Sequence, residues 1–283
     1  MLTRTIVNSV LTAAKYRPKT DHLIFVGDMI AKGPNSPAVV DLAMSHNASC
    51  VRGNHEDRVL LTHRDLAIHS RSKKKHNSPP SPGLPAEASK PELTADYEKL
   101  VNDPSLDKEV EEFSRLDIAE RALARQLTKT HIEYLSHCPN ILDVGPIPGM
   151  GQVHIVHAGL VPHVHLERQD PISVLHMRTI DLETHVPSSK AKGTPWFKLW
   201  NKYQSMLPAN KRATVIYGHD SKRGLQLAEY TKGLDTGCVK GGKLTALVIE
   251  ADAKKNKEPE VVSVQCKDYR HLEKEMVNKA TVG

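Results

Sequence analysis

Short hydrophobic runs that end in turn residues recur along the chain and predict β-strands. They lie at residues 22–27, 48–52, 152–157, 213–218, 244–250 and 260–266. The first two flank NSPAVVDLAMSHN, where a cap-like Asn or Ser followed by Pro predicts a helix. A strand–helix–strand unit of this kind makes at least part of the sheet parallel. The last two runs flank DAKKNKEP and are typical of an antiparallel hairpin.

The first seventeen residues, MLTRTIVNSVLTAAKYR, admit two interpretations. Their Arg, Ser and Thr without any acid suit a mitochondrial transit peptide. Alternatively they form an amphipathic helix of the fold, with Ile6, Val7, Val10 and Leu11 on one face. We favour the helix, because it leads into the first strand through a short loop.

The segment SRSKKKHNSPPSPGLPAEASKPE, residues 70–92, breaks the pattern with five prolines and a basic run. It contains almost nothing to bury, so we expect a disordered loop. From Leu93 to His137 the sequence turns helical. We therefore expect one domain over residues 1–283, with a disordered insertion at about 70–92 and a flexible tail from about 272.

Composition indicates a globular protein with an anionic partner. Hydrophobic residues make up 39% and charged residues 25% of the 283 residues, and no apolar run approaches the length of about 20 that spans a bilayer. The formal net charge of +6 favours a polyanionic, phosphate-rich substrate. Nucleic acid is disfavoured, because aromatic residues amount to only 4% and do not interleave with the basic tract.

The four cysteines, Cys50, Cys138, Cys238 and Cys266, are widely spaced. No CxxC pair occurs, so the sequence predicts neither a zinc knuckle nor a disulfide framework. We expect four buried thiols.

Polar side chains follow four of the predicted strands directly. Asp28 follows LIFVG, Asn54 follows ASCVRG, His157 follows QVHIV and His219 follows RATVIYG. Ligands bind at this end of the strands in α/β sheets. A single such residue is more often a capping, core or turn residue, but four in register favour a site. One carboxylate, one amide oxygen and two imidazoles suit Zn, Mn, Fe or Co.

Further residues near this edge suit phosphate chemistry. His55 lies beside Asn54 but is expected to point towards substrate, where an imidazole can protonate a leaving oxygen. Lys32, Arg52 and Arg223 can hold phosphoryl oxygens.

The blocks GDMIAKGP, RGNHE, HAGLVP and YGHDSKRG resemble, in this order, the signature of calcineurin-like metallophosphatases. GLDTGCVKGGKLTALVI and Met177-Arg178 are most similar to the branch of bacterial diadenosine tetraphosphatase (ApaH-like), whose fungal relatives include an endopolyphosphatase. The resemblance implies a hydrolase with a four-layer α/β/β/α sandwich, mixed sheets and a binuclear centre of divalent ions (Zn, Mn, Fe, Co or Mg). It also implies a cytoplasmic or vacuolar location.

By this resemblance, Asp28 would bridge two metals and Asn54, His157 and His219 would complete the second metal site. His55 would be the proton donor and Arg52 a phosphate clamp.

Two departures from the family pattern matter. Phosphoprotein phosphatases carry Asp and Arg where this chain has Ala31 and Lys32, so the carboxylate that orients their catalytic His is gone. The family also begins with a strand ending in Asp-x-His-Gly, and no Asp here has His two residues later. We therefore expect the first strand and two ligands to be missing, and a single bound ion.

Three functions follow as hypotheses. The first is a metal-dependent hydrolase of polyphosphate or dinucleoside polyphosphates. The second is an inactive pseudo-phosphatase that binds phosphorylated partners through the surviving half-site. The third, a serine/threonine protein phosphatase, is disfavoured by Ala31 and Lys32.

Overall fold

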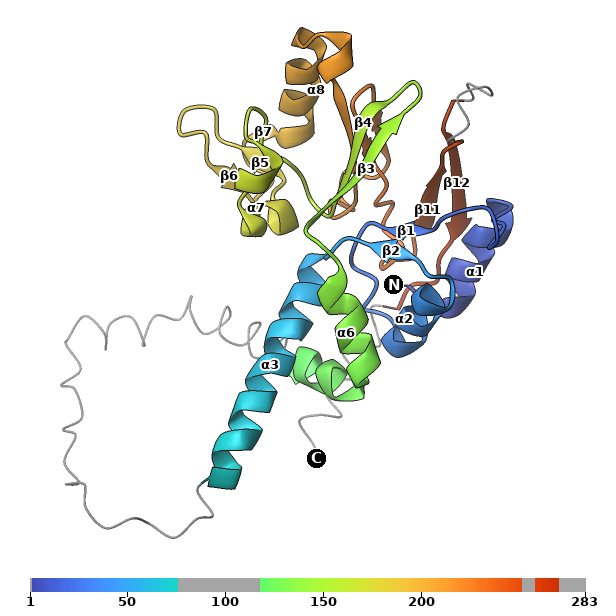
Figure 1. The fold of residues 1–283 in the computed structure, drawn as a ribbon, viewed down its shortest axis with the longest axis vertical. Coiled ribbons are helices and arrows are strands. Elements are labelled where there is room, and N and C mark those ends of the chain that lie inside the picture. Colours follow the sequence, from blue (N-terminus) through green and yellow to red (C-terminus); the bar gives the residue numbers. More distant parts are fainter. Residues whose placement is uncertain (1, 76–117, 251–257, 270–283) are drawn as a thin grey trace, which may run out of the picture.

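A computed structural model describes residues 2–75, 118–250 and 258–269. Its first part is the predicted strand–helix–strand unit (Figure 1). β1 (Ile24–Phe25) and β2 (Ser49–Cys50) pair in parallel, and α2 (Ser36–Ser45) connects them. α1 (Arg4–Ala13) precedes this unit and the long α3 (Asn54–Lys75) follows it.

A mixed five-stranded sheet forms the centre of the molecule, in the order β3-β4-β8-β10-β9. A helix over residues 118–126 and α6 (Lys129–His137) lead into it. β4 runs parallel to β8, and β8 to β10, whereas β3 and β9 are antiparallel edge strands. The bounds are β3 Ile141–Ile147, β4 Gly151–Val156, β8 Ala213–Tyr217, β9 Gln226–Ala228 and β10 Thr231–Gly233.

The segment between β4 and β8 folds into a small lobe beside the sheet (Figure 1). A three-stranded sheet in the order β6-β5-β7 lies there with two helices. Its elements are η1 Leu166–Arg168, α7 Pro171–His176, β5 Thr179–Ile180, β6 Pro187–Ser188, β7 Thr194–Pro195, α8 Trp196–Met206 and η2 Ala209–Lys211. The hairpin of β11 (Lys243–Val248) and β12 (Glu260–Gln265) closes the described fold and contacts α1.

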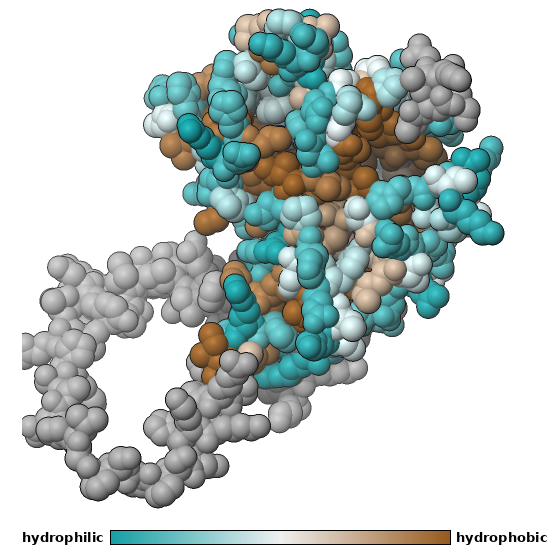
Figure 2. Space-filling model, viewed as in Figure 1, coloured by the Kyte–Doolittle hydropathy of each residue, from teal (hydrophilic) through white to brown (hydrophobic). Residues whose placement is uncertain are grey.

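Three hydrophobic clusters hold these elements together. Val39, Val59 and Leu135, all fully buried, belong to the cluster under the N-terminal helices. Trp196 belongs to the cluster between the small lobe and the sheet, and Val153 to the one between the sheet and β2. Figure 2 shows hydrophobic residues gathered around β3, β4 and the β11–β12 hairpin, framed by hydrophilic side chains. Full burial of one such side chain contributes about 1.5–3 kcal/mol.

The prediction of four buried thiols is wrong, although all four sulfurs are buried. Cys50 is bonded to Cys138, with 88 residues of separation, and Cys238 to Cys266, with 28. The spacing of the cysteines along the sequence does not predict this pairing. Cys50 in β2 meets Cys138 at the end of α6, and Cys238 before β11 meets Cys266 after β12, only once the chain has folded.

The structure confirms the six predicted strands, the parallel first pair and the final hairpin. It also confirms the N-terminal helix, whose Val7 and Val10 are buried. α3 continues through Lys75, so residues 70–75 are helical where we expected the disordered insertion to begin. The rest of that segment, 76–92, and the tail from 272 lie outside the described residues. None of the helices in the described ranges is long and apolar enough to cross a membrane.

Candidate metal centre

Four strand ends bring the predicted ligand side chains to one point. Asp28 follows β1, Asn54 opens α3 after the short loop that follows β2, His157 follows β4 and His219 follows β8. The His157 Nε2 atom lies 3.0 Å from Asn54 Oδ1, 3.1 Å from His219 Nδ1 and 3.3 Å from Asp28 Oδ2. The structure therefore brings the four predicted side chains together, and their role as ligands stays a prediction.

The spacing of these atoms fits a metal ion. Ligand atoms about 2.1 Å from a tetrahedral ion lie about 3.4 Å from one another. The ligand atoms of Asp28, His157 and His219 all lie within 4.8 Å of one another, and in the described part of the chain they form the one such group of His, Cys, Asp and Glu. The described residues thus supply ligands for one ion.

Backbone carbonyls fix which nitrogen of each imidazole faces the site. The Nδ1–H of His157 donates to the Val26 carbonyl at 3.0 Å, which leaves Nε2 for the metal. The Nε2–H of His219 donates to the His176 carbonyl at 3.1 Å, which leaves Nδ1. In each histidine the N–H therefore lies on the nitrogen that points away from the cluster, which leaves the other nitrogen able to bind a metal ion.

The site is electrostatically poised for a cation. Burial would raise the pKa of the Asp28 carboxyl, but His157 and His55 hold it well below its usual range. Burial would lower the pKa of His157, but the Asp28 charge outweighs burial and raises it to about 9. Burial, followed by the charges of His157 and Arg178, lowers the pKa of His219 to about 3. The ionised carboxylate of Asp28 thus faces the protonated ring of His157, and a bound metal ion would take the place of the proton on Nε2.

The predicted proton donor lies at the edge of this cluster. The His55 backbone N–H donates to Asp28 Oδ1 at 3.3 Å, and the His55 Nε2 atom lies 4.0 Å from Asp28 Oδ2. Burial, and then the charges of Lys32, His157 and Arg58, lowers the pKa of the His55 ring to about 4. Its side chain is 13% exposed, so it has access to a bound substrate.

Left-handed backbone shapes the loop that carries Asp28. Gly27 has φ +85° and Asp28 has φ +54°. A Cβ on Gly27 would lie 2.6 Å from His157 Nδ1, so only glycine lets this loop approach the histidine. Non-glycine residues at positive φ are concentrated at functional sites, where the surrounding structure must hold them.

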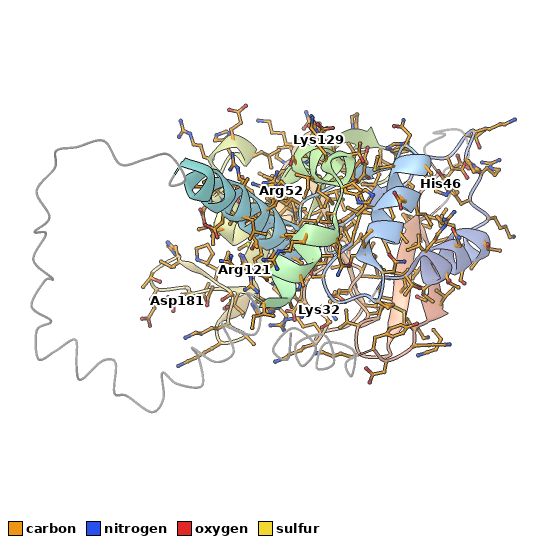
Figure 3. All side chains as sticks on the ribbon, turned by 90° about the horizontal axis from the view of Figure 1, so that it is seen from below. Lys32, His46, Arg52, Arg121, Lys129 and Asp181 are labelled. Carbon is orange, nitrogen blue, oxygen red and sulfur yellow. A yellow bond between two sulfur atoms is a disulfide. The ribbon has the colours of Figure 1, made fainter. Side chains whose placement is uncertain are left out.

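The predicted phosphate-binding residues differ in their surroundings. Arg52 lies where α3 and α6 meet (Figure 3); its guanidinium donates to the Ser136 carbonyl at 3.0 Å and contacts Asp57 at 3.4 Å. Arg223 is bound to Asp220 at 2.8 Å. Lys32 lies near enough to His55 to lower its pKa. All three assignments stay predictions.

Arg178 is a cation that the sequence interpretation missed as a site residue. Its Nε lies 3.6 Å from Asp220 Oδ1, next to His219, and its Nη1 donates to the Ser189 carbonyl at 2.9 Å. Arg178 follows no long strand, so the strand-end rule did not reveal it. The Met177-Arg178 pair in the family resemblance was the available signal.

Comparison with known proteins agrees with this geometry. The family described as calcineurin-like phosphoesterase matches residues 3–236. The zinc-dependent endopolyphosphatase of Saccharomyces cerevisiae is 29% identical over 86% of this chain and 72% of that protein. The symmetrical bis(5'-nucleosyl)-tetraphosphatase of Methylobacillus flagellatus is 25% identical over 86% of each chain. The crystal structure of a putative diadenosine tetraphosphatase superposes with a TM-score of 0.62, at 25% identity, over 93% of this chain and 89% of its own.

These matches confirm the predicted mixed α/β fold and the ApaH-like resemblance, and they imply divalent metals. The chain belongs to the calcineurin-like phosphoesterase family of hydrolases.

Proposed function

We propose that this chain hydrolyses phosphoanhydride bonds of polyphosphate or dinucleoside polyphosphates, using one divalent cation held by Asp28, Asn54, His157 and His219. The observation that carries the proposal is the convergence of Asp28, Asn54 and His219 on His157 Nε2 within 3.3 Å. An oxygen and nitrogen donor set of this kind favours zinc or a similar first-row ion.

Two further observations support this substrate class. The relative from S. cerevisiae is named as zinc-dependent and as an endopolyphosphatase, and several bacterial relatives as tetraphosphatases. The net charge of +6 favours a polyanion of many phosphates over a small neutral ester.

The residues around the cluster have separate tasks. A divalent cation held by Asp28, Asn54, His157 and His219 would supply Lewis-acid polarisation of the phosphoryl group and an activated water. His55, beside Asp28, would donate a proton to the leaving oxygen once the negative charge of a bound polyphosphate raises the pKa of its ring, which burial lowers to about 4 in the free protein. Arg178, whose charge acts on His219, and Lys32, whose charge acts on His55, are placed to hold phosphoryl oxygens. Asp220 keeps the Arg178 guanidinium in place.

A pseudo-phosphatase is the second candidate. The described residues contain ligands for one ion, whereas two-metal catalysis requires a pair of ions. Such a protein would bind phosphorylated partners through the same cations without turnover. Binding of polyphosphate without phosphate release would identify it.

The compartment is a separate proposal. Disulfides form and persist in oxidising environments, so the two buried disulfides favour a vacuolar over a cytoplasmic location. Thiol labelling of the protein taken from its own cells, without reductant, should find no free cysteine. Four reactive thiols after denaturation would contradict this proposal.

The experiment that tests the function uses the purified chain loaded separately with Zn²⁺, Mn²⁺ and Co²⁺. Phosphate and nucleotide release would be measured with polyphosphate and with diadenosine tetraphosphate. We expect hydrolysis of at least one of them that stops in chelator and returns with metal. Absence of turnover with every metal, in a chain that binds metal, would contradict the proposal.

A further inference from the structure

One buried carboxylate near the metal cluster is not among the predicted ligands. Glu56 lies in the first turn of α3, two residues after Asn54, and its side chain is fully buried. Its Oε2 accepts the backbone N–H groups of both Asp28 and Gly53, each at 2.8 Å. Its Oε1 accepts the N–H of Ile30 at 3.1 Å.

These three hydrogen bonds join two separate loops. Asp28 and Ile30 belong to the loop after β1, and Gly53 belongs to the loop after β2 that leads directly into Asn54. One oxygen atom of Glu56 therefore sets the position of one ligand-bearing loop against the other. None of the three hydrogen bonds of Glu56 involves His157 or His219.

The first loop needs such a restraint. Asp28 and Ala31 both have positive φ, +54° and +90°, a conformation that side-chain-bearing residues rarely adopt unless neighbouring groups hold them. The bonds from Asp28 and Ile30 to Glu56 fall inside this stretch. Glu56 thus holds Asp28 at its positive φ and holds Ile30 next to Ala31, whose own N–H donates to Ser36 Oγ at 3.2 Å.

The two loops also pack too closely for a side chain between them. A Cβ on Gly53 would lie 2.6 Å from Glu56 Oε2 and against the Asp28 carboxylate. Together with the His55 N–H bond to Asp28 Oδ1, the carboxylate of Glu56 therefore ties the second loop to Asp28.

We propose that Glu56 is a positioning residue of the metal centre, which fixes Asp28 relative to Asn54 by bridging their two loops. This inference rests on the proposed metal site, since its effect is on ligand geometry and not on contact with substrate. Groups that hold metal ligands in place typically contribute about 10–100-fold to metal affinity.

The test compares two substitutions of similar volume with a matched control. Glu56→Met removes all three acceptor contacts, and Glu56→Gln keeps one carbonyl oxygen. The control, Gln204→Met, also removes a buried acceptor of a backbone N–H, that of Ala213 at 2.8 Å, in α8 away from the cluster. The probe is Co²⁺ alone, followed by titration and by its visible absorption spectrum, with a thermal unfolding curve for each variant.

We expect Glu56→Met to weaken Co²⁺ binding about 10–100-fold and to alter the spectrum. Gln204→Met should bind Co²⁺ as the natural chain does, even where it unfolds at a lower temperature. If Glu56→Met does not fold, Glu56→Gln should still show weaker binding and an altered spectrum. Natural affinity and spectrum in the Glu56 variants, or equal weakening in Gln204→Met, would overturn the inference.

The titration contains no substrate, so the two proposals fail separately. A natural chain that binds Co²⁺ but releases no phosphate contradicts the proposed hydrolysis and leaves the role of Glu56 standing.

Discussion

His157 makes more contacts within the cluster than any other predicted ligand. Its ring is 1% exposed, its Nδ1–H is held by Val26, and its Nε2 faces Asp28, Asn54 and His219. His157→Ala should therefore weaken metal binding by more than the roughly 100-fold loss typical of an outer-shell partner. Isothermal titration with Zn²⁺ measures this loss.

His154 provides the matched control for that substitution. It lies in β4, the strand that His157 follows, and is also buried, but it faces Asp143 instead of the cluster. His154→Ala should lose stability and keep natural Zn²⁺ affinity. Equal loss of affinity in both variants would show that burial, and not ligation, determines the result.

Substitution of His55 distinguishes a role in proton transfer from a role in metal binding. Its Nε2 lies 4.0 Å from Asp28 Oδ2, within reach of a substrate bound at the cluster but farther than a ligand contact. His55→Ala should lower kcat by about 10²–10⁴-fold, as loss of a general acid does, while metal content stays unchanged. Elemental analysis beside steady-state kinetics checks both. Parallel loss of metal and activity would identify His55 as a ligand or structural residue instead.

At the scale of elements, the hydrophobic pattern predicted six strands, because each has an apolar run that ends in turn residues. It missed β3, whose sequence ILDVGPI contains Gly145 and Pro146. A proline is tolerated there because β3 is an edge strand, and the register shifts between Asp143 and Gly145. It also missed the two-residue strands of the small lobe and the three-residue strands β9 and β10 of the central sheet, whose pairing depends on tertiary contacts.

At the site, too, the sequence pattern did not reveal residues whose roles depend on tertiary contacts. Asp28, Asn54, His157 and His219 were predictable because each comes at the end of a predicted strand. The strand pattern did not indicate Arg178 or Glu56, since their proposed roles arise from contacts with Asp220 and with the loops after β1 and β2. Those contacts exist only in the folded chain.

The Cys50–Cys138 disulfide joins β2 to the end of α6, immediately before the loop that carries Asn54. Replacing both cysteines with serine should lower the free energy of unfolding by about 2–5 kcal/mol. The pair Cys238–Cys266 closes a shorter loop of 28 residues against 88, so its loss should cost about 1 kcal/mol less in the chain-entropy account. Guanidinium unfolding followed by circular dichroism measures both. A larger loss from the shorter loop would contradict this ordering.

At the scale of the whole molecule, the cluster joins the N-terminal βαβ unit to the central sheet. The unit supplies Asp28 and Asn54, and the sheet supplies His157 and His219. Metal binding therefore joins the two parts and should stabilise the fold as a whole, by linkage.

Asp28, Asn54, His157 and His219 are expected to hold one divalent ion together. The most direct measurement is elemental analysis of the natural chain after saturation with Zn²⁺ and removal of excess metal. We expect about one zinc per chain, since tetrahedral zinc takes four protein or water ligands. Two zinc ions per chain, or none, would contradict the account.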